Sequence, residues 1–157
     1  MRKGKLQSLV LIGAVLLSGC TEQPESLVVD MFSVSGTGET VGKIYIHAND
    51  EGGIRLQPAL HDLPPGELTL QVHEQPSCAS GEQDGEPVAA SATDDQPGDK
   101  SALPLLIVDS YGVADSPIET RRFNLNDLRG RSLIVHTNDP TLTDSARIAC
   151  GTVVGEQ

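Results

Sequence analysis

Eight short segments in which apolar and polar residues alternate constrain the fold of this chain more than any other feature of its sequence. They are Leu27–Val34, Gly42–His47, Gly53–Leu60, Leu68–Glu74, Leu103–Asp109, Ile118–Leu125, Ser132–His136 and Arg147–Val154. A period of two is typical of strands with one buried face, because successive side chains point to opposite sides of a sheet. Turn sequences such as Leu63-Pro64-Pro65-Gly66 separate these segments. The pattern predicts an all-β domain, an antiparallel sandwich or barrel of eight strands.

Two stretches interrupt this rhythm. Residues 79–102 are rich in Gly, Pro, Ser, Ala and acidic residues, and their composition favours a long, mobile, solvated loop. The segment Asn126–Gly130 is expected to form at most one helical turn. The 157 residues otherwise suit a single domain of ordinary size.

The amino terminus has the features of an export signal. Basic residues at positions 2, 3 and 5 precede an apolar run, Leu9–Leu17, that is too short for a stable transmembrane helix. The run ends in Leu17-Ser18-Gly19-Cys20, which resembles the lipobox of bacterial lipoproteins. This resemblance implies cleavage before Cys20 and a lipid on its sulfur. An ordinary signal peptide with an incidental cysteine is the alternative.

The lipobox divides the chain into three parts: a signal peptide over 1–19, the lipidated Cys20 with a tether over 20–26, and the folded domain over 27–157. Thr21, rather than an acidic residue, follows the cysteine, which in the lipoproteins favours the outer membrane. We therefore expect a domain that faces the periplasm of a bacterial cell envelope and is held to the membrane through Cys20.

The charge of the chain limits its partners. It has 11 basic and 22 acidic residues, a net charge of −11, and without the three basic residues of the signal the remaining 8 face the same 22 acids, a net charge of −14. Nucleic acid is excluded as a partner, because phosphate binding needs clustered Lys and Arg. Anionic small molecules are also repelled unless a local cation attracts them.

Two cysteines are left once Cys20 carries the lipid, Cys78 and Cys150. An even pair in an exported domain is most simply a disulfide, because the compartment is oxidising. Two free thiols are the alternative.

Several motifs then resemble the bacterial copper/zinc superoxide dismutases, in the same order and spacing over about residues 27–154. They are Val41-Gly42-Lys43-Ile44-Tyr45-Ile46, Leu60-His61-Asp62-Leu63-Pro64-Pro65-Gly66-Glu67, Val72-His73-Glu74-Gln75-Pro76-Ser77-Cys78, Gly130-Arg131-Ser132-Leu133-Ile134-Val135-His136 and Ala146-Arg147-Ile148-Ala149-Cys150-Gly151. The resemblance implies a Greek-key β-sandwich or barrel. It also places Cys78 and Cys150 where that family keeps its intramolecular disulfide.

The same resemblance implies which positions hold metal. Two copper ligands come from a His-x-His pair, which here reads Gln71-Val72-His73, so that one ligand is replaced by Gln. His136 matches the copper ligand of a later strand. Arg147 matches the residue that guides and holds superoxide, and it is the catalytic candidate if the protein is active. Otherwise Arg147 is a surface cation that pairs with a carboxylate.

The remaining ligands of the family have no counterpart. Residues 79–102 contain no histidine, and Ala102 stands where a zinc-binding Asp precedes Leu-Pro. The zinc site and the bridging copper ligand are therefore expected to be absent, and Gln71 is expected to fill space as a hydrogen-bonding residue. His47 should face solvent, since Ile44 and Ile46 face inward, and His61 is expected at the surface.

These departures favour a non-catalytic binding or structural module of the envelope. Two alternatives stay open for His73 and His136: a residual copper-dependent superoxide dismutase, which converts superoxide to O2 and H2O2, and copper capture without turnover. Both histidines can also be packed strand residues that bind nothing. A homodimer is compatible with the family.

Overall fold

A computed structural model of the protein describes residues 26–34, 38–74, 78, 81–83, 86–88, 102–137 and 147–154. The predicted signal peptide, the predicted lipid site at Cys20 and most of the acidic segment 79–102 lie outside these residues. The described elements are β1 (Ser26–Ser33), β2 (Thr40–Ala48), β3 (Ile54–Leu60), β4 (Gly66–His73), β5 (Gly81–Gln83), β6 (Glu86–Val88), β7 (Leu106–Val108), β8 (Ile118–Thr120), α1 (Leu125–Leu128), β9 (Ser132–Thr137) and β10 (Arg147–Thr152).

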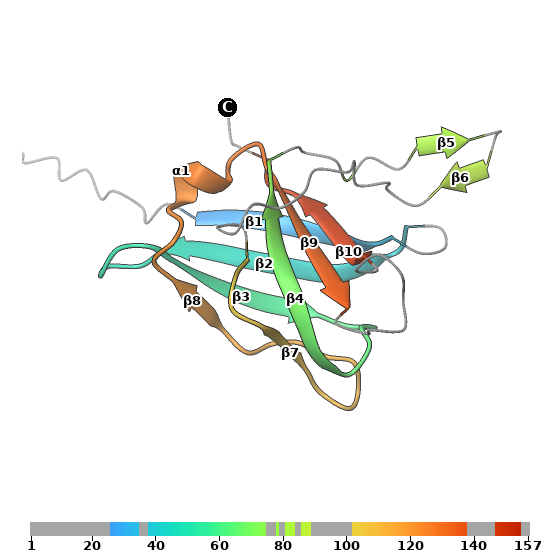
Figure 1. Ribbon diagram of the computed structural model, residues 1–157, viewed down its shortest axis with the longest axis horizontal. Coiled ribbons are helices and arrows are strands. Elements are labelled where there is room, and N and C mark those ends of the chain that lie inside the picture. Colours follow the sequence, from blue (N-terminus) through green and yellow to red (C-terminus); the bar gives the residue numbers. More distant parts are fainter. Residues whose placement is uncertain are drawn as a thin grey trace, which may run out of the picture.

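Eight of these strands form one antiparallel sheet in the order β7-β4-β9-β10-β1-β2-β3-β8. β1, β2 and β3 are neighbours in sequence and in space, whereas β4 leaves them and pairs with β9. Figure 1 shows β4 and β9 crossing in front of β1, β2 and β3. The sheet nearly closes on itself, because Ala114, between β7 and β8, pairs with Leu60 of β3. The predicted eight-stranded Greek-key barrel is thus confirmed.

The core is built by the alternation that the sequence displays. In β1, Leu27, Val29 and Met31 are buried while the residues between them are exposed. Buried side chains of β2, β3, β4, β9 and β10 join them in one cluster inside the barrel. Each such aliphatic side chain stabilises the fold by about 1.5–3 kcal/mol. A single core of this kind holds all the strands that carry candidate site residues.

A bulge in β2 requires a glycine. Met31 pairs with Gly42 and Phe32 with Thr40, so Val41 is an extra residue opposite β1. Gly42 has a φ of +118°, a conformation that residues with a Cβ rarely adopt. A Cβ there would also collide with the carbonyl oxygen of Ala59 on β3. Glycine therefore lets β2 bend between its two neighbours.

The prediction of a strand over Ile118–Leu125 is wrong beyond Thr120, since α1 occupies Leu125–Leu128. The side chain of Asn124 accepts a hydrogen bond from the backbone N–H of Asp127, and the Asp127 carboxylate accepts one from the N–H of Asn124. This reciprocal pair is a capping box, which begins a helix. The expected helical turn is present but begins at Leu125 rather than Asn126.

The other corrections concern segment 79–109. The strand predicted over Leu103–Asp109 is shortened to β7, and Pro104, which has no N–H, lies between β7 and the isolated pairing of Ala102 with Gln71. The segment predicted to be an irregular loop contains the paired strands β5 and β6, which lie apart from the barrel in Figure 1.

No helix within the described part of the chain is both long enough and apolar enough to cross a membrane.

Candidate functional site

The outer face of β4 carries two of the residues that the sequence singled out. Leu70 and Val72 are buried in the core, so the alternation of the strand directs Gln71 and His73 to the opposite side of the sheet. His73 is nevertheless only 2% exposed. Its imidazole is shielded from solvent although it lies outside the barrel.

The neighbouring strand β9 supplies the second imidazole. In the register, His136 lies opposite Thr69 and His73 lies opposite Ser132. In spite of this offset the ring centroids of His73 and His136 are 5.7 Å apart, with their planes 21° from parallel. His136 is 6% exposed, so the two histidines form a shielded, stacked pair.

Gln71 lies between the two histidines in the register, opposite Ile134. Its Oε1 atom is buried and accepts no hydrogen bond from the described residues. The Nε2 atoms of His73 and His136 also make no hydrogen bond there, although both residues have other interactions. A buried acceptor without a donor costs roughly 1–3 kcal/mol. Gln71 therefore lies on the face that carries the two imidazoles, and its oxygen lacks the hydrogen bond expected of a buried acceptor.

Strand β10 brings Arg147 to the same face. Arg147 lies opposite His136, and the pairing then shifts between Arg147 and Ala149, a bulge that leaves Ile148 out of the ladder. Arg147 is half-buried and has interaction partners of its own. The sequence-based candidates Gln71, His73, His136 and Arg147 thus come from three adjacent strands and share one outer face.

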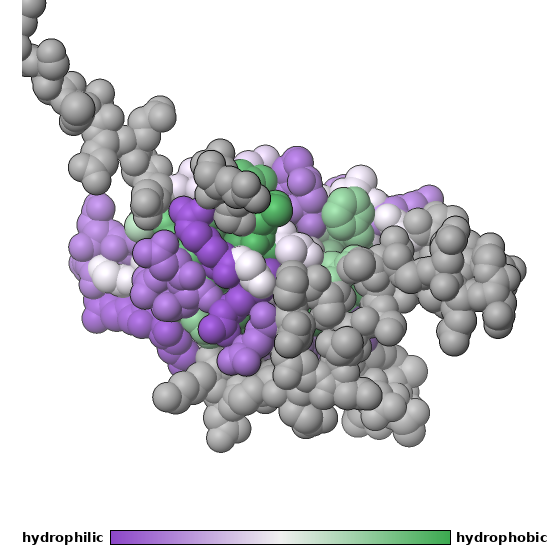
Figure 2. Space-filling model, turned by 90° about the horizontal axis from the view of Figure 1, so that it is seen from above, coloured by the Kyte–Doolittle hydropathy of each residue, from purple (hydrophilic) through white to green (hydrophobic). Residues whose placement is uncertain are grey.

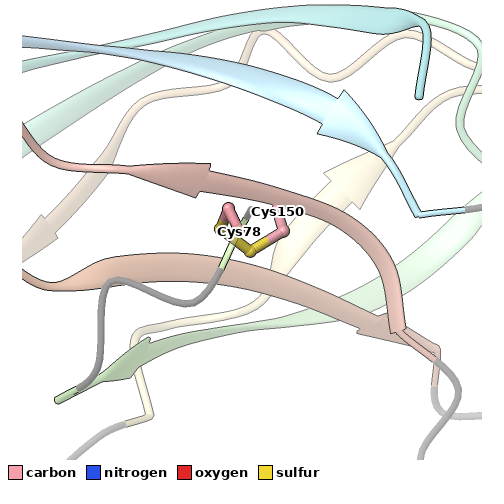
Figure 3. Close-up of a disulfide and its surroundings, with 2 residues drawn as sticks. All are labelled: Cys78 and Cys150. Atoms are coloured by element: carbon pink, nitrogen blue, oxygen red, sulfur yellow. A yellow bond between two sulfur atoms is a disulfide. The ribbon is translucent and has the colours of Figure 1, made fainter. Parts of the chain in front are cut away.

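The predicted disulfide is present beside this site. Cys78 is bonded to Cys150, with a Cα–Cα distance of 5.6 Å, as Figure 3 shows. Cys150 of β10 lies opposite Ile134 of β9, which in turn lies opposite Gln71. The disulfide therefore fixes the end of β4 to β10 across the strand that carries His136.

The two other histidines do not join the site. His47 is exposed on the outer face of β2, as its alternation with Ile44 and Ile46 predicts. His61 is exposed as expected, and its Nδ1 lies 2.7 Å from Oδ2 of Asp62. Among the residues that the structure describes, no group of three or more His, Cys, Asp or Glu side chains is placed to hold a metal ion.

Sequence reasoning missed one residue of this face, Ser132. It is fully buried and lies opposite His73. The signal was available in the period of two that relates Ser132 to Ile134 and His136.

Comparison with known proteins agrees with this architecture. A sequence model of the family described as copper/zinc superoxide dismutase (SODC) matches residues 40–153. The chain belongs to the copper/zinc superoxide dismutase family. It is 31% identical to a superoxide dismutase of the Cu-Zn type from Photobacterium leiognathi, over 91% of this chain and 96% of the relative.

Two further members of the copper/zinc superoxide dismutase family show the same relationship. Superoxide dismutase 2 of the Cu-Zn type from Salmonella typhimurium is 27% identical, over 95% of this chain and 99% of the relative. The structure of the Cu/Zn superoxide dismutase from Brucella abortus superposes with a TM-score of 0.65 and 29% identity, over 82% of this chain and 99% of that one.

The family implies copper and zinc in general, and the residues of this site can be tested against them. Copper(II) prefers several nitrogen or oxygen donors in a tetragonal arrangement. The outer face provides two imidazoles, and the Gln71 carboxamide on the same face has a buried oxygen that is a weak donor. This donor set does not fit a four-nitrogen copper centre.

Proposed function

We propose that this protein is an exported lipoprotein whose superoxide dismutase-like domain serves the cell envelope as a non-catalytic binding or structural module. The observation that carries the proposal is the number of histidines that lie at the site. The chain has four histidines, and two of them, His47 and His61, are exposed away from the outer face of β4 and β9. At most two imidazoles, those of His73 and His136, are available for any metal.

The absence of a zinc site follows from the same reasoning. Segment 79–102 contains no histidine, and the position of the family's zinc-binding Asp is Ala102, whose methyl side chain cannot bind a metal. Ala102 pairs with Gln71, so this position lies at the site without providing a ligand. The domain is proposed to lack zinc and half of the copper ligands.

The proposed domain is also a poor environment for superoxide. Mature protein with a net charge of −14 repels an anion, and this repulsion is strongest at low salt. Among the described residues, Arg147 is the cation that the register places opposite a site imidazole, and it is half-buried.

Metal analysis combined with a dismutase assay tests the proposal. The mature protein is incubated with Cu(II) and Zn(II), desalted, and measured for metal content and for superoxide dismutation on the same sample. The enzyme from Photobacterium leiognathi, treated identically, is the positive control. We expect no zinc, substoichiometric copper and no dismutation. One copper per chain with dismutation would overturn the proposal.

A specific observation favours the second candidate, a residual copper-dependent superoxide dismutase or a copper-capturing protein. The imidazoles of His73 and His136 are only 5.7 Å apart, and Arg147 lies opposite His136. Dismutation that is abolished by either His73→Ala or His136→Ala would establish the enzyme, for which Arg147 is the proposed anion guide. Copper retained by both histidines without turnover would establish capture.

The location is proposed from the lipobox alone: an outer membrane lipoprotein anchored through Cys20 and facing the periplasm. Mass spectrometry of the amino-terminal peptide from membranes should find an acylated Cys20, and a Cys20→Ala variant should be recovered without lipid in the soluble fraction. Equal recovery of both proteins in the soluble fraction would contradict the anchor.

A further inference from the structure

Three adjacent strands, β1, β2 and β3, present an outer face that is unusual for so acidic a protein. We call it the β1–β3 outer face, and its exposed or half-buried residues are Val28, Asp30, Phe32, Lys43, Tyr45, His47, Arg55, Gln57 and Ala59. Three large apolar residues are substantially exposed here: Val28 by 44%, Phe32 by 43% and Tyr45 by 38%. In Figure 2, which views a single face of the molecule, hydrophobic residues also reach the surface among hydrophilic ones.

The apolar residues of this face are neighbours across strands. Val28 lies opposite Tyr45, and in the next pair on the same face Asp30 lies opposite Lys43. Phe32 follows at the end of β1, where it lines a hollow of about 240 Å³ together with Val154. Val154 is 72% exposed and extends the apolar surface beyond β10.

The charge of the β1–β3 outer face differs from that of the chain. The three strands contain one acidic residue, Asp30, and two basic residues, Lys43 and Arg55, whereas the whole chain has a net charge of −11. Lys43 is paired with Asp30, and the hydrogen bond and the charge of Asp30 raise the pKa of Lys43, so its ammonium stays charged at neutral pH. Arg55 is paired with Glu119 of β8, so the charges of this face are nearly balanced and the acidic excess lies elsewhere.

The distance from the proposed anchor limits which face can reach a membrane. β1 begins at Ser26, six residues after Cys20, and six extended residues span at most about 20 Å. A domain of this size has a radius of gyration of roughly 14 Å, and therefore a diameter well above the reach of the tether. Ser26 lies opposite His47, next to the pair formed by Val28 and Tyr45. The β1–β3 outer face thus begins where the tether ends.

A second exposed apolar group is less favourably placed. Leu105 and Ile107 are 44% and 49% exposed at β7, and Tyr111, which follows β7, is 88% exposed. β7 is four strands away from β1 in the sheet. If exposure alone decided which apolar group contacts a membrane, the group at β7 would be chosen. The short tether instead favours the β1–β3 outer face, because β1 begins where the tether ends.

We propose that the β1–β3 outer face lies against the phospholipid bilayer that holds the lipid of Cys20. The inference rests on the lipoprotein anchor of the proposed function. Tyr45 and Phe32 are aromatic residues suited to the interface between headgroups and acyl chains. Apolar contact of this kind adds binding free energy to that of the lipid anchor.

Tryptophan fluorescence provides the test, because the chain contains no Trp. Tyr45→Trp and Tyr111→Trp each introduce one reporter on an exposed aromatic position. The lipidated proteins are bound to vesicles of phosphatidylethanolamine and phosphatidylglycerol that contain lipids brominated in the acyl chain. We expect the emission of the Tyr45→Trp protein to be quenched and shifted to shorter wavelength, and that of the Tyr111→Trp protein to be unchanged. Equal quenching of both reporters, or of neither, would overturn the proposal.

A charge placed on the face sharpens the test. In the Tyr45→Trp protein, Val28→Glu should reduce the quenching about twofold or more, because it removes apolar contact and adds repulsion. Ile107→Glu, at a position of similar exposure on β7, should leave it unchanged. A spectral shift of Tyr45→Trp that appears without vesicles and grows with protein concentration would instead show that a second copy covers this face, and would overturn the proposal.

The lipid anchor at Cys20 and the membrane contact of the β1–β3 outer face can be tested independently of each other. In a chain that begins at Cys20, the disulfide occupies Cys78 and Cys150, so a maleimide-linked lipid can be attached to Cys20 in vitro. All described residues are present in this chain. Quenching of Tyr45→Trp here supports the face even if cells do not acylate Cys20. Acylation in cells without quenching here overturns the face and leaves the anchor intact.

Discussion

The imidazole rings of His73 and His136 lie 5.7 Å apart although the two residues are not opposite each other in the sheet. The position between them belongs to Gln71, which lies opposite Ile134. A third imidazole at position 71 would therefore share the outer face with the other two. The structure thus places an amide on the strand position between the two histidines, on the same outer face.

Restoring that ligand is the first test of this arrangement. Gln71→His should tighten copper(II) binding roughly tenfold or more. Loss of a residue that only hydrogen-bonds a metal ligand already weakens metal binding by about tenfold, and position 71 would provide a ligand itself. Titration against a chromophoric chelator measures the change. Gln57→His is the matched control, because Gln57 is a half-buried glutamine on the outer face of β3. Equal affinities for the two variants would mean that His73 and His136 do not act together with position 71.

Removal of metal should have no effect on the stability of the wild-type protein. A ligand present at 100 times its Kd stabilises the folded state by about 2.7 kcal/mol, which for a domain of this size raises the Tm by several degrees. Since the site provides only two imidazoles, we expect the same Tm by calorimetry with added copper and with a strong chelator. A Tm that falls with chelator in the wild type, but not in His73→Ala, would identify a bound metal.

The disulfide should account for a large share of the stability of the domain. Cys78 and Cys150 are 72 residues apart, and a cross-link over a loop of that length stabilises a fold by about 4 kcal/mol in the chain-entropy model. The double variant Cys78→Ser and Cys150→Ser should lose about this amount in urea unfolding. Thiol labelling of the unfolded, non-reduced wild type should find neither cysteine free, and labelling of both would contradict the bond.

The sequence predicted the strands well because one face of each is buried. Alternation gives a strand directly, and it placed His47 in solvent and directed Gln71 and His73 to one face. It could not predict that His73 and His136 approach each other, because register between strands far apart in sequence depends on packing of the whole barrel. The resemblance to the superoxide dismutases, rather than periodicity, brought these residues together.

The errors have local causes that the sequence contained. Asn124 and Asp127 have the spacing of a capping box, which should have ended the strand predicted through Leu125. Asp84-Gly85 is a two-residue hairpin turn sequence, and Gln83 and Glu86 on either side of it pair in the structure. In both cases the cap or turn chemistry decides the local structure.

Two glycines, Gly42 and Gly52, have a positive φ, but a Cβ would collide with a neighbour only at the first of them. Alanine substitutions at the two positions therefore distinguish the cost of the backbone conformation from the cost of a steric collision. Gly42 has a φ of +118° and its Cβ would meet the backbone of Ala59, whereas Gly52 has a φ of +87° and nothing within 4 Å. Gly52→Ala should therefore cost only about 1–2 kcal/mol, for the backbone conformation. Gly42→Ala adds about 1–3 kcal/mol for the collision and should unfold at clearly lower urea concentration.

Comparing Gly42→Ala with Gly52→Ala also tests the packing of the β1–β3 outer face. The bulge at Gly42 lies where β1, which carries Phe32, pairs with β2, which carries Lys43. If Gly42→Ala folds with the stability of Gly52→Ala, then β2 and β3 can separate without cost at this point. The close contact between Gly42 and Ala59 would then not hold these strands together, and the packing described for this edge of the face would be wrong.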